Sequence, residues 1–304
     1  MKRTALLLFV LIATLSSSAQ ETHVFARRDT ADLKLDIYRP ARPRGDGACV
    51  LYVYGGGFAA GRRNDDYSRQ CCQMLADRGF VAVAMDYRLY LQHPAQVPLL
   101  RAYTLFDTAI CWAVEDCSDA IAYLCEHADS LSIDPSKMVL TGCSAGAITV
   151  LQTDYCRTNR MPATAALPAT FAPAAVVAYA GGVFCTDGRL HYGIPPAPTC
   201  LIHGTCDKVV SYGRLRGGWN AVLHGANSLA RHYSRQGYCH WILRFADRGH
   251  EIASSLPLLI DEFCAFADAA LSGRIMQYDA TCTDAAIKRT KWTDMTLLDL
   301  YRLP

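Results

Sequence analysis

The sequence predicts an α/β fold, with a mostly parallel sheet of about eight strands and helices on both faces. Short apolar runs, typical of strands buried on both faces, alternate along the chain with longer helical segments. Neither an internal repeat nor a linker marks a second unit. We therefore expect one large domain over residues 20–272, followed by an extension over residues 273–304 that packs on its surface.

The predicted elements follow in chain order. Strands at 23–28 and 33–38 flank a turn at residues 29–32, as in an antiparallel hairpin at the sheet edge. The remaining predicted strands are apolar and cover residues 48–54, 80–87, 137–141, 174–180, 198–203 and 239–245. The predicted helices cover residues 67–78, with Gly79 as the stop, 105–127, 147–155, 219–236 and 255–271.

The first residues have the layout of a secretory signal peptide. Lys2 and Arg3 precede an apolar run over residues 5–15, and small residues lead to Ala19. Because this run is too short to span a bilayer, we expect cleavage after Ala19 and export to the periplasm or beyond, without stable membrane insertion.

The charge balance excludes some partners. Of 30 basic and 28 acidic residues, the leader 1–19 holds two basic ones and no acidic one, which leaves 28 of each. A chain near neutrality has no electrostatic reason to bind nucleic acid or anionic membranes.

The fourteen cysteines do not indicate a metal site. No C-x-x-C pair occurs, and no Cys/His set has zinc-finger spacing. In an exported chain some disulfides are plausible. Cys200 and Cys239 each open a predicted strand, and they are the pair that we expect to bridge.

A G-x-S-x-G pattern spans residues 142–146, with Ser144 at its centre. A strand is predicted before it and a helix after it. A serine on such a turn is pushed out at the sheet edge, and the helix start directs free backbone N–H groups toward charge that develops beside it. Ser144 is therefore the candidate nucleophile, whereas Cys143 is expected to fill space beneath the turn.

Two later loops supply partners for this serine. A serine hydroxyl needs a base within hydrogen-bond reach, which is itself oriented by a carboxylate. His250 lies in the loop after the last predicted strand, beside Gly249, and Asp207 follows the preceding strand. The order Ser144, Asp207, His250 is the order that this arrangement requires on an α/β sheet.

A glycine loop, residues 54–58, follows the strand at 48–54. Successive glycines let backbone N–H groups approach an oxyanion without a Cβ in the way. We assign Gly56 and Gly57 as donors, with Ala145 as the third. A phosphate-binding loop is the rival interpretation, but the G-x-G-x-x-G frame and the P-loop lysine are both missing, so we expect no cofactor.

These motifs resemble those of the α/β-hydrolase superfamily, in particular its carboxylesterases of the hormone-sensitive-lipase-like and cholinesterase-like groups. The matching segments are residues 54–58, 86–88, 142–146, 203–207 and 249–250. The resemblance implies the α/β-hydrolase fold, acyl transfer to Ser144 and hydrolysis of the acyl-enzyme by water that His250 activates. It also implies that residues 86–88 support the glycine loop from beneath.

The chain departs from the resemblance in two places. Tyr54 stands where the lipase-like group usually has histidine, and residues 180–198 are too few for a substantial cap domain. We therefore expect a small or minimal lid, formed by residues 89–103 or 210–219, over a pocket open to bulky or polymer-attached esters.

The expected function is that of an exported serine carboxylesterase acting on short acyl or aromatic esters, including esters that decorate plant polysaccharides. Two alternatives stay open. A serine peptidase of the prolyl-oligopeptidase type would use the same triad, although such enzymes usually carry a propeller before the catalytic domain. A non-catalytic binding module on the same fold is the other alternative, but such proteins tend to lose a triad residue or the glycine loop.

Overall fold

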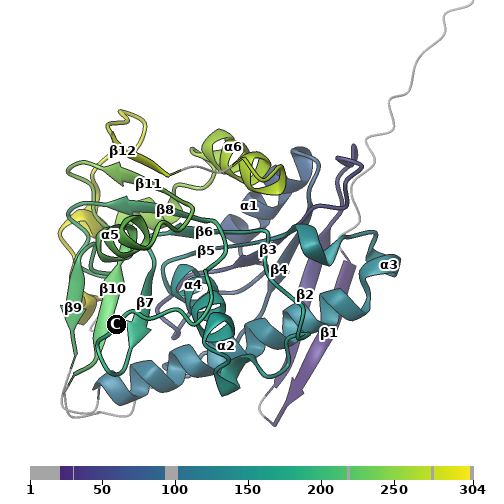
Figure 1. Ribbon diagram of the computed structural model, residues 1–304, viewed down its shortest axis with the longest axis horizontal. Helices are drawn as coiled ribbons and strands as arrows, with labels where there is room; N and C mark the ends of the chain where they lie inside the picture. Colours follow the sequence, from purple (N-terminus) through teal and green to yellow (C-terminus); the bar gives the residue numbers. More distant parts are fainter. Residues whose placement is uncertain (1–20, 30, 93–101, 218–219, 275–276, 302–304) are drawn as a thin grey trace, which may run out of the picture.

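The computed structural model describes residues 21–301, except 30, 93–101, 218–219 and 275–276. Its centre is a nine-stranded sheet in the order β1-β2-β4-β3-β5-β6-β8-β11-β12 (Figure 1). β2 runs antiparallel to both of its neighbours, and all other neighbouring strands run parallel. The strands are β1 (Glu21–Arg28), β2 (Ala31–Tyr38), β3 (Cys49–Val53), β4 (Val81–Met85), β5 (Met138–Cys143), β6 (Ala175–Tyr179), β8 (Thr199–Gly204), β11 (His240–Phe245) and β12 (Tyr278–Cys282). The predicted fold class is confirmed, with one strand more than expected.

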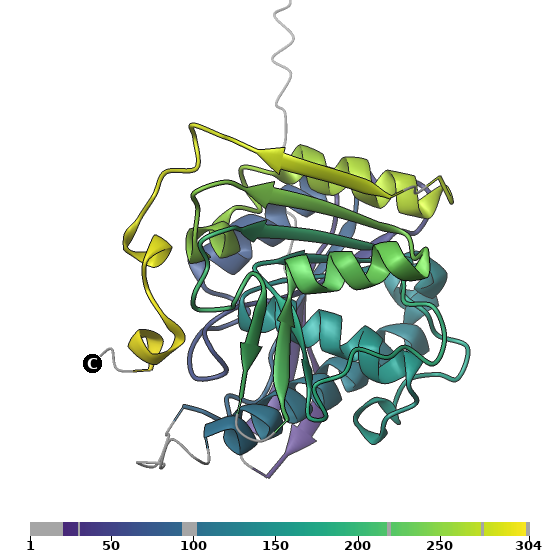
Figure 2. The same ribbon diagram turned by 60° about the vertical axis from the view of Figure 1, so that its left-hand side comes forward.

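Helices cover both faces of this sheet (Figures 1 and 2). α1 (Asp66–Asp77) and α6 (Ile260–Leu271) lie on one face, and α2 (Ala102–Glu126), α4 (Ala145–Thr158) and α5 (Ala226–Gln236) lie on the other. The short helices are α3 (Ala128–Leu131) and α7 (Leu297–Leu300), and the 3-10 turns are η2 (Pro135–Lys137), η3 (Pro162–Thr164), η4 (His250–Ser254) and η5 (Lys291–Thr293). In the part of the chain that the structure describes, none of the helices has both the length and the apolar character of a membrane span.

Sequence chemistry explains where these elements lie. Every residue of the central strands β3, β4, β5, β6 and β8 is buried, as their continuous apolar runs predict. α1 begins after Asp65, whose carboxylate accepts a hydrogen bond from the Ser68 N–H, and it ends just before Gly79, which has φ +90°. The predicted stop at Gly79 is therefore confirmed.

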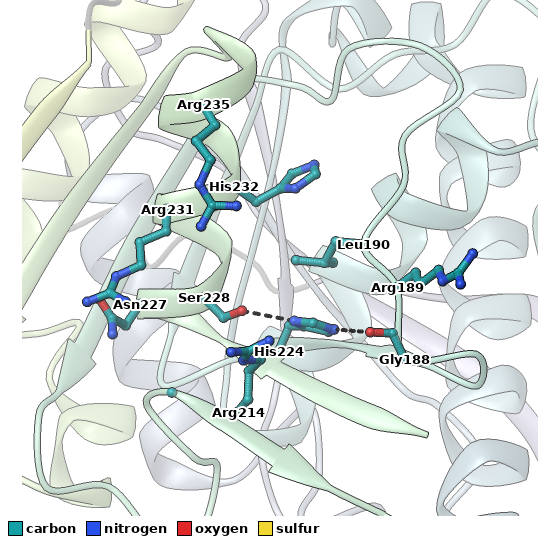
Figure 3. A pocket seen from close by; sticks show the side chains of 11 residues that line it. Gly188, Arg189, Leu190, Arg214, His224, Asn227, Ser228, Arg231, His232 and Arg235 are labelled. Atoms are coloured by element: carbon teal, nitrogen blue, oxygen red, sulfur yellow. Dashed lines mark hydrogen bonds between the residues drawn. The ribbon is translucent and has the colours of Figure 1, made fainter. Parts of the chain in front are cut away.

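A second, three-stranded antiparallel sheet was not predicted. It has the order β7-β10-β9 and consists of β7 (Gly182–Cys185), β10 (Val222–Gly225) and β9 (Arg214–Arg216). His224 on β10 ties the sheet to its surroundings, because its ring hydrogen-bonds the Ser228 hydroxyl of α5 and the carbonyl of Gly188 (Figure 3).

This small sheet corrects the predicted helix over residues 219–236. The helix begins only at Ala226, after an extended Gly225 (φ −78°, ψ −178°). Val222 and Leu223 instead pair with β7, because a partner strand far away in the sequence outweighs local helix preference. Residues 214–216 of the second predicted lid segment also form part of this sheet.

Two further predictions differ from the structure. The helix predicted over residues 255–271 starts at Ile260, since residues 255–259 form hydrogen-bonded turns in which the N–H groups of Leu258 and Leu259 donate to the Ser255 carbonyl. Cys200 is a free, buried cysteine, and the parallel register aligns it with Trp241 and not with Cys239, so the expected bridge is wrong.

Some predictions lie outside the described residues. The predicted signal peptide, residues 1–19, is among them, and so are residues 93–101 of the first predicted lid segment and residues 218–219 of the second.

Candidate active site

Ser144 stands on the turn between β5 and α4, in a backbone conformation that few non-glycine residues adopt. Its φ is +52° and its ψ is −119°. The turn is held in place on both sides, because the Ser144 N–H bonds the Tyr179 carbonyl at 2.9 Å and the Ser144 carbonyl accepts from the Ile148 N–H at 2.9 Å. Backbone strain that surrounding contacts enforce is typical of functional sites.

The glycines that flank Ser144 are required by close backbone approach. A Cβ on Gly146 would lie 2.0 Å from the Val53 carbonyl oxygen, and one on Gly142 would lie 2.5 Å from the carbonyl carbon of Gly146. The G-x-S-x-G spacing thus lets α4 start directly against the end of β3.

Gly146→Ala is expected to destabilise the fold by about 3 kcal/mol or more, since a methyl group facing a main-chain carbonyl at 2.0 Å can be accommodated only by moving the turn. Urea unfolding followed by circular dichroism measures the change. Gly213→Ala is the matched control, because a Cβ at Gly213 meets nothing within 4 Å. Equal stability of the two variants would contradict the packing described here.

The structure brings the three predicted residues Ser144, His250 and Asp207 into one hydrogen-bonded chain. His250 Nε2 lies 2.8 Å from Ser144 Oγ, and His250 Nδ1 lies 2.8 Å from Asp207 Oδ2. All three side chains come from the carboxyl ends of strands in the parallel part of the sheet, and all three residues are buried. The imidazole can therefore accept the serine proton at Nε2 while the carboxylate holds the other ring nitrogen.

Asp207 is held as a carboxylate by several donors. Its Oδ1 accepts hydrogen bonds from the N–H groups of Val209 (2.9 Å) and Val210 (3.1 Å). Burial alone would raise the pKa of Asp207, but contacts with His203 and His250 outweigh it and hold the pKa well below its usual range. The acid thus stays ionised where an imidazolium forms.

His203 is a neighbour of this acid that the sequence analysis quoted within a motif but gave no role. It is fully buried, and its Nε2 lies 3.2 Å from Asp207 Oδ2 and 2.9 Å from the Val210 carbonyl oxygen. An N–H at Nε2 can donate to both the Asp207 carboxylate and the Val210 carbonyl, so His203 holds the loop that carries Asp207 in place. Its position four residues before Asp207 is the signal that could have identified it.

The glycine loop lies directly against the serine turn. A Cβ on Gly55 would lie 2.9 Å from the Cys143 carbonyl oxygen and 3.2 Å from Ser144 Cβ. Gly56 and Gly57 both have positive φ, +123° and +63°. The Gly56 carbonyl accepts hydrogen bonds from the N–H groups of Ala59 and Ala60, and these bonds fix the plane of the Gly56–Gly57 peptide. Because the Gly57 N–H belongs to the same planar peptide, its direction is fixed as well.

The third proposed donor, Ala145, is the first residue of α4. Its N–H lies in the first turn, where an α-helix provides no acceptor of its own, and it is therefore available to an oxyanion beside Ser144.

Residues 86–88 support the glycine loop from below, as the resemblance implied. The Tyr87 hydroxyl donates to the Tyr54 carbonyl at 3.1 Å, and the two rings stack with centroids 4.5 Å apart. Arg63, which follows the loop, bonds Asp86 at 2.7 Å and lies 3.0 Å from buried Asp36.

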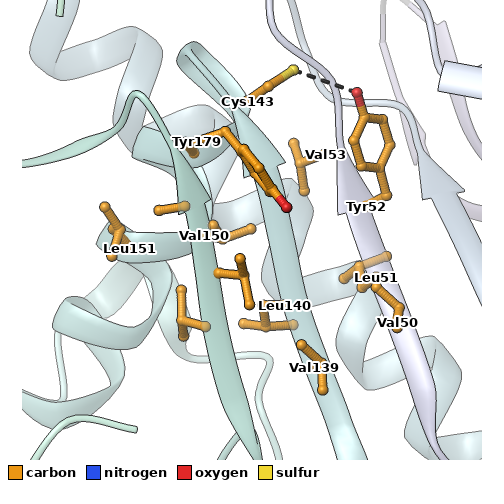
Figure 4. Close-up of a cluster of buried hydrophobic side chains, with 14 of the residues drawn as sticks. Val50, Leu51, Tyr52, Val53, Val139, Leu140, Cys143, Val150, Leu151 and Tyr179 are labelled. Carbon is orange, nitrogen blue, oxygen red and sulfur yellow. Dashed lines mark hydrogen bonds between the residues drawn. The ribbon is translucent and has the colours of Figure 1, made fainter. Parts of the chain in front are cut away.

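Cys143 belongs to the packing beneath the turn. Its Sγ lies 3.4 Å from the Tyr52 hydroxyl on the neighbouring strand, among side chains of β3, β5 and α4 (Figure 4). Burial raises the pKa of the Cys143 thiol to about 11, which keeps it protonated and unreactive near neutral pH.

The carboxyl-terminal segment, residues 290–301, touches three of the site's loops, those that carry His250, Asp207 and the glycines. Thr293 is buried, and its hydroxyl donates to Glu251 Oε1, which also accepts from the Gly249 N–H beside His250. The Trp292 ring lies 6.1 Å from the His250 ring, centroid to centroid.

The same segment continues to the other two loops. The backbone carbonyl of Lys208, next to Asp207, accepts a hydrogen bond from the Leu297 N–H. The Tyr301 hydroxyl donates to the Gly57 carbonyl at 2.8 Å. Residues 273–304 were expected to pack on the domain surface. Instead, their first part adds β12 to the main sheet, and residues 290–301 brace the site (Figure 2).

Tyr301→Phe is expected to lower kcat for ester hydrolysis about fivefold with little change in Tm. The net contribution of one hydrogen bond is about 1 kcal/mol, and here it holds the peptide next to the oxyanion donors. Tyr278→Phe is the matched control, because Tyr278 lies half exposed on β12. A kcat equal to that of the control would show that Tyr301 has no part in holding the loop.

Within the described residues, no group of three or more His, Cys, Asp or Glu side chains is placed to hold a metal ion. The arrangement can instead activate a serine, stabilise an oxyanion and move a proton between serine, base and leaving group.

Known proteins resemble this chain over part of its length. The BD-FAE protein family matches residues 35–164, which include the glycine loop and the serine turn. Lipase 2 of Moraxella sp. (strain TA144) is 30% identical over 139 residues, which are 44% of this chain and 28% of the lipase. Ethyl acetate hydrolase of Pseudomonas putida is 32% identical over 121 residues, 39% of this chain and 33% of that enzyme. The matched segments thus span about a third or less of these curated relatives.

The solved structures match over more of the chain. Esterase 2 of the planctomycete Thermogutta terrifontis superposes with a TM-score of 0.58 at 20% identity, over 84% of this chain and 93% of that esterase. The superposition shows that this chain has the α/β-hydrolase fold, and segments of the chain are similar in sequence to curated esterases and lipases.

Proposed function

We propose that this chain is a serine carboxylesterase that acts through Ser144, His250 and Asp207. The observation that carries the proposal is the unbroken chain of two 2.8 Å contacts from Ser144 Oγ through His250 to Asp207. The glycine loop lies against the same serine. The N–H groups of this loop are the oxyanion donors that we propose for acyl transfer. The names of the curated relatives, a lipase and an ethyl acetate hydrolase, support the same reaction class.

The proposed reaction has two halves. Ser144 Oγ attacks the ester carbonyl carbon, its proton passes to His250 Nε2, and the resulting oxyanion is held by the N–H groups of Gly56, Gly57 and Ala145. The intermediate then collapses, and the leaving alkoxide takes the proton from His250. Water repeats the sequence on the acyl-enzyme, which releases the acid and restores the Ser144 hydroxyl.

Aromatic side chains pack directly behind the proposed oxyanion donors. Phe58 follows Gly57 directly and packs edge to face on Phe106 of α2, with centroids 5.7 Å apart. Phe106 packs in the same way on Phe184 of β7, again at 5.7 Å. Phe58 is fully buried and Phe184 is buried, so this row of rings packs behind the glycine loop and stabilises it, and only Phe106 is partly exposed.

Export and a carbohydrate-linked substrate form the finer part of the proposal. The leader-like residues 1–19 support export, and the short stretch between β6 and β8 leaves little room for a cap over the serine. An enzyme without a large cap inserted between these two strands suits esters carried on a polymer outside the cell.

A substrate panel tests the proposal. The chain, without residues 1–19, is assayed on p-nitrophenyl esters of increasing acyl length, methyl ferulate, acetylated xylan and a prolyl p-nitroanilide. We expect kcat/KM to be highest for the short or aromatic acyl esters and the anilide to remain uncleaved. Cleavage of the anilide without ester hydrolysis would replace the esterase by a peptidase, and inactivity on every substrate would favour a binding module.

A further inference from the structure

A basic hollow lies beside the small sheet, away from the serine. It has a volume of about 570 Å³, is open to solvent and is lined by residues of α5, β9, β10 and the loop after β7 (Figure 3). None of Ser144, His250 and Asp207 lines it. The ionisable side chains around it are all basic, four arginines and two histidines, namely Arg189, Arg214, Arg231, Arg235, His224 and His232.

The four arginines of this hollow differ from most others in the chain. Ten arginines elsewhere in the described part lie within ion-pair distance of a carboxylate. Among the described residues, no carboxylate lies within that distance of Arg189, Arg214, Arg231 or Arg235, which are all exposed. In a chain with almost equal numbers of acids and bases, this is a local excess of positive charge.

The excess has a cost in stability that a ligand would offset. Arg231 and Arg235 lie one turn apart on the same face of α5, an arrangement in which like charges repel. Burial and then the charge of Arg235 lower the pKa of His232. Burial, with Arg214 and His232, lowers the pKa of His224 against the Gly188 carbonyl and the charge of Asp187, which both raise it. The hollow therefore disfavours further positive charge and attracts anions.

The hollow is preformed. His224, at its floor, is buried and bonds Ser228 on one side at 2.9 Å and the Gly188 carbonyl on the other at 3.2 Å (Figure 3). These bonds fix the loop that carries Arg189 against the helix that carries Arg231, so the guanidinium groups need little reorganisation of the backbone to bind.

A second hollow of about 360 Å³ continues the first. The two share Gly188, Arg189 and Arg214, and the second adds Arg216 on β9. It also includes Asp187, whose carboxylate accepts a hydrogen bond from the Arg189 N–H. We call the two hollows together the basic trough, defined by Arg189, Arg214, Arg216, Arg231 and Arg235.

The shape and chemistry of the basic trough favour an extended anion. A guanidinium group binds a carboxylate through two parallel hydrogen bonds, and five such groups along two adjoining hollows match several anionic groups spaced along a chain. Among the residues that the structure describes, no Phe, Tyr or Trp lines either hollow, so the described lining offers no ring on which a nucleic-acid base could stack.

We propose that the basic trough binds an acidic oligosaccharide through its uronate carboxylates and so holds a glycan-linked ester at the enzyme. This inference rests on the proposed esterase function. The trough begins close to the acid loop, since Gly213 follows Tyr212, whose N–H bonds the Asp207 carbonyl. Tyr212 also contacts His203, with ring centroids 5.7 Å apart.

Calorimetric titration with oligogalacturonate of defined length tests the proposal. The wild-type chain should bind it, and Arg214→Ala/Arg231→Ala should bind it at least about tenfold more weakly, because two charge-assisted contacts are lost. The control Arg27→Ala/Arg42→Ala removes the same charge from exposed arginines elsewhere and should bind like wild type. Neutral xylo-oligosaccharides should not bind.

Activity on p-nitrophenyl acetate separates this inference from the proposed function. Both double variants should hydrolyse p-nitrophenyl acetate at the wild-type rate. If the wild-type chain itself does not hydrolyse this ester, the proposed esterase function is wrong. If the esterase activity is present, two results would overturn the basic trough as a glycan site. One is that the wild-type chain does not bind oligogalacturonate, and the other is that both double variants bind it equally more weakly. Tighter binding of a single-stranded oligonucleotide of equal charge would overturn the carbohydrate assignment.

Discussion

Ser144→Ala is expected to abolish ester hydrolysis and labelling by a fluorophosphonate probe, and to leave the fold intact. The substitution removes the one oxygen that His250 Nε2 contacts at 2.8 Å, so no acyl-enzyme can form. Loss of a nucleophile in such a triad lowers kcat by about a millionfold, to the level that oxyanion donors and binding alone sustain. The alanine keeps the positive φ of the turn without placing new atoms, so Tm should change little.

The labelling experiment is read against an exposed serine. Ser130→Ala, on α3, should label and turn over like wild type. Labelling that survives Ser144→Ala, with circular dichroism unchanged, would remove Ser144 from the role of nucleophile.

Asp207→Asn is expected to lower kcat by about a thousandfold to ten-thousandfold, through the histidine tautomer. The N–H groups of Val209 and Val210 point at Oδ1 of Asp207, so the amide oxygen of an asparagine takes that place. Its NH₂ group then faces His250 Nδ1, which must become an acceptor. The imidazole proton moves to Nε2, and this nitrogen can no longer accept the proton of Ser144.

The measurement for this variant is kcat against pH, with Tm as the check on folding. Asp187→Asn, an exposed aspartate that lines the basic trough, should keep the wild-type rate on p-nitrophenyl acetate. Near-normal turnover by Asp207→Asn would mean that another group orients His250.

The predictions that succeeded depend on short stretches of sequence. Apolar runs buried on both faces locate β3, β4 and β5 within a residue or two. Gly142 and Gly146 are required because the backbone approaches closely at both positions. Every sharp turn from a strand into a helix of this kind requires the same close approach, so the pattern can be recognised in the sequence. The candidate site residues could be named before the structure because each follows its own strand.

The sequence-based predictions failed where the local structure depends on segments that lie far away in the sequence. Residues 222–225 and 278–282 become strands because β7 and β11 offer them a partner, and nothing in their own sequence specifies that partner. The contacts of Thr293 and Tyr301 with the catalytic loops join residues 42 and 244 positions apart, a separation that no local pattern records.

The brace formed by residues 290–301 also sets the order in which the site is completed during synthesis. The glycine loop and the serine turn leave the ribosome early, whereas Tyr301, which holds Gly57, emerges 244 residues later. A nascent chain can assemble most of its parallel sheet while its oxyanion loop still lacks this support. The hydrogen bond that supports the oxyanion loop can thus form only after residues 290–301 have been made.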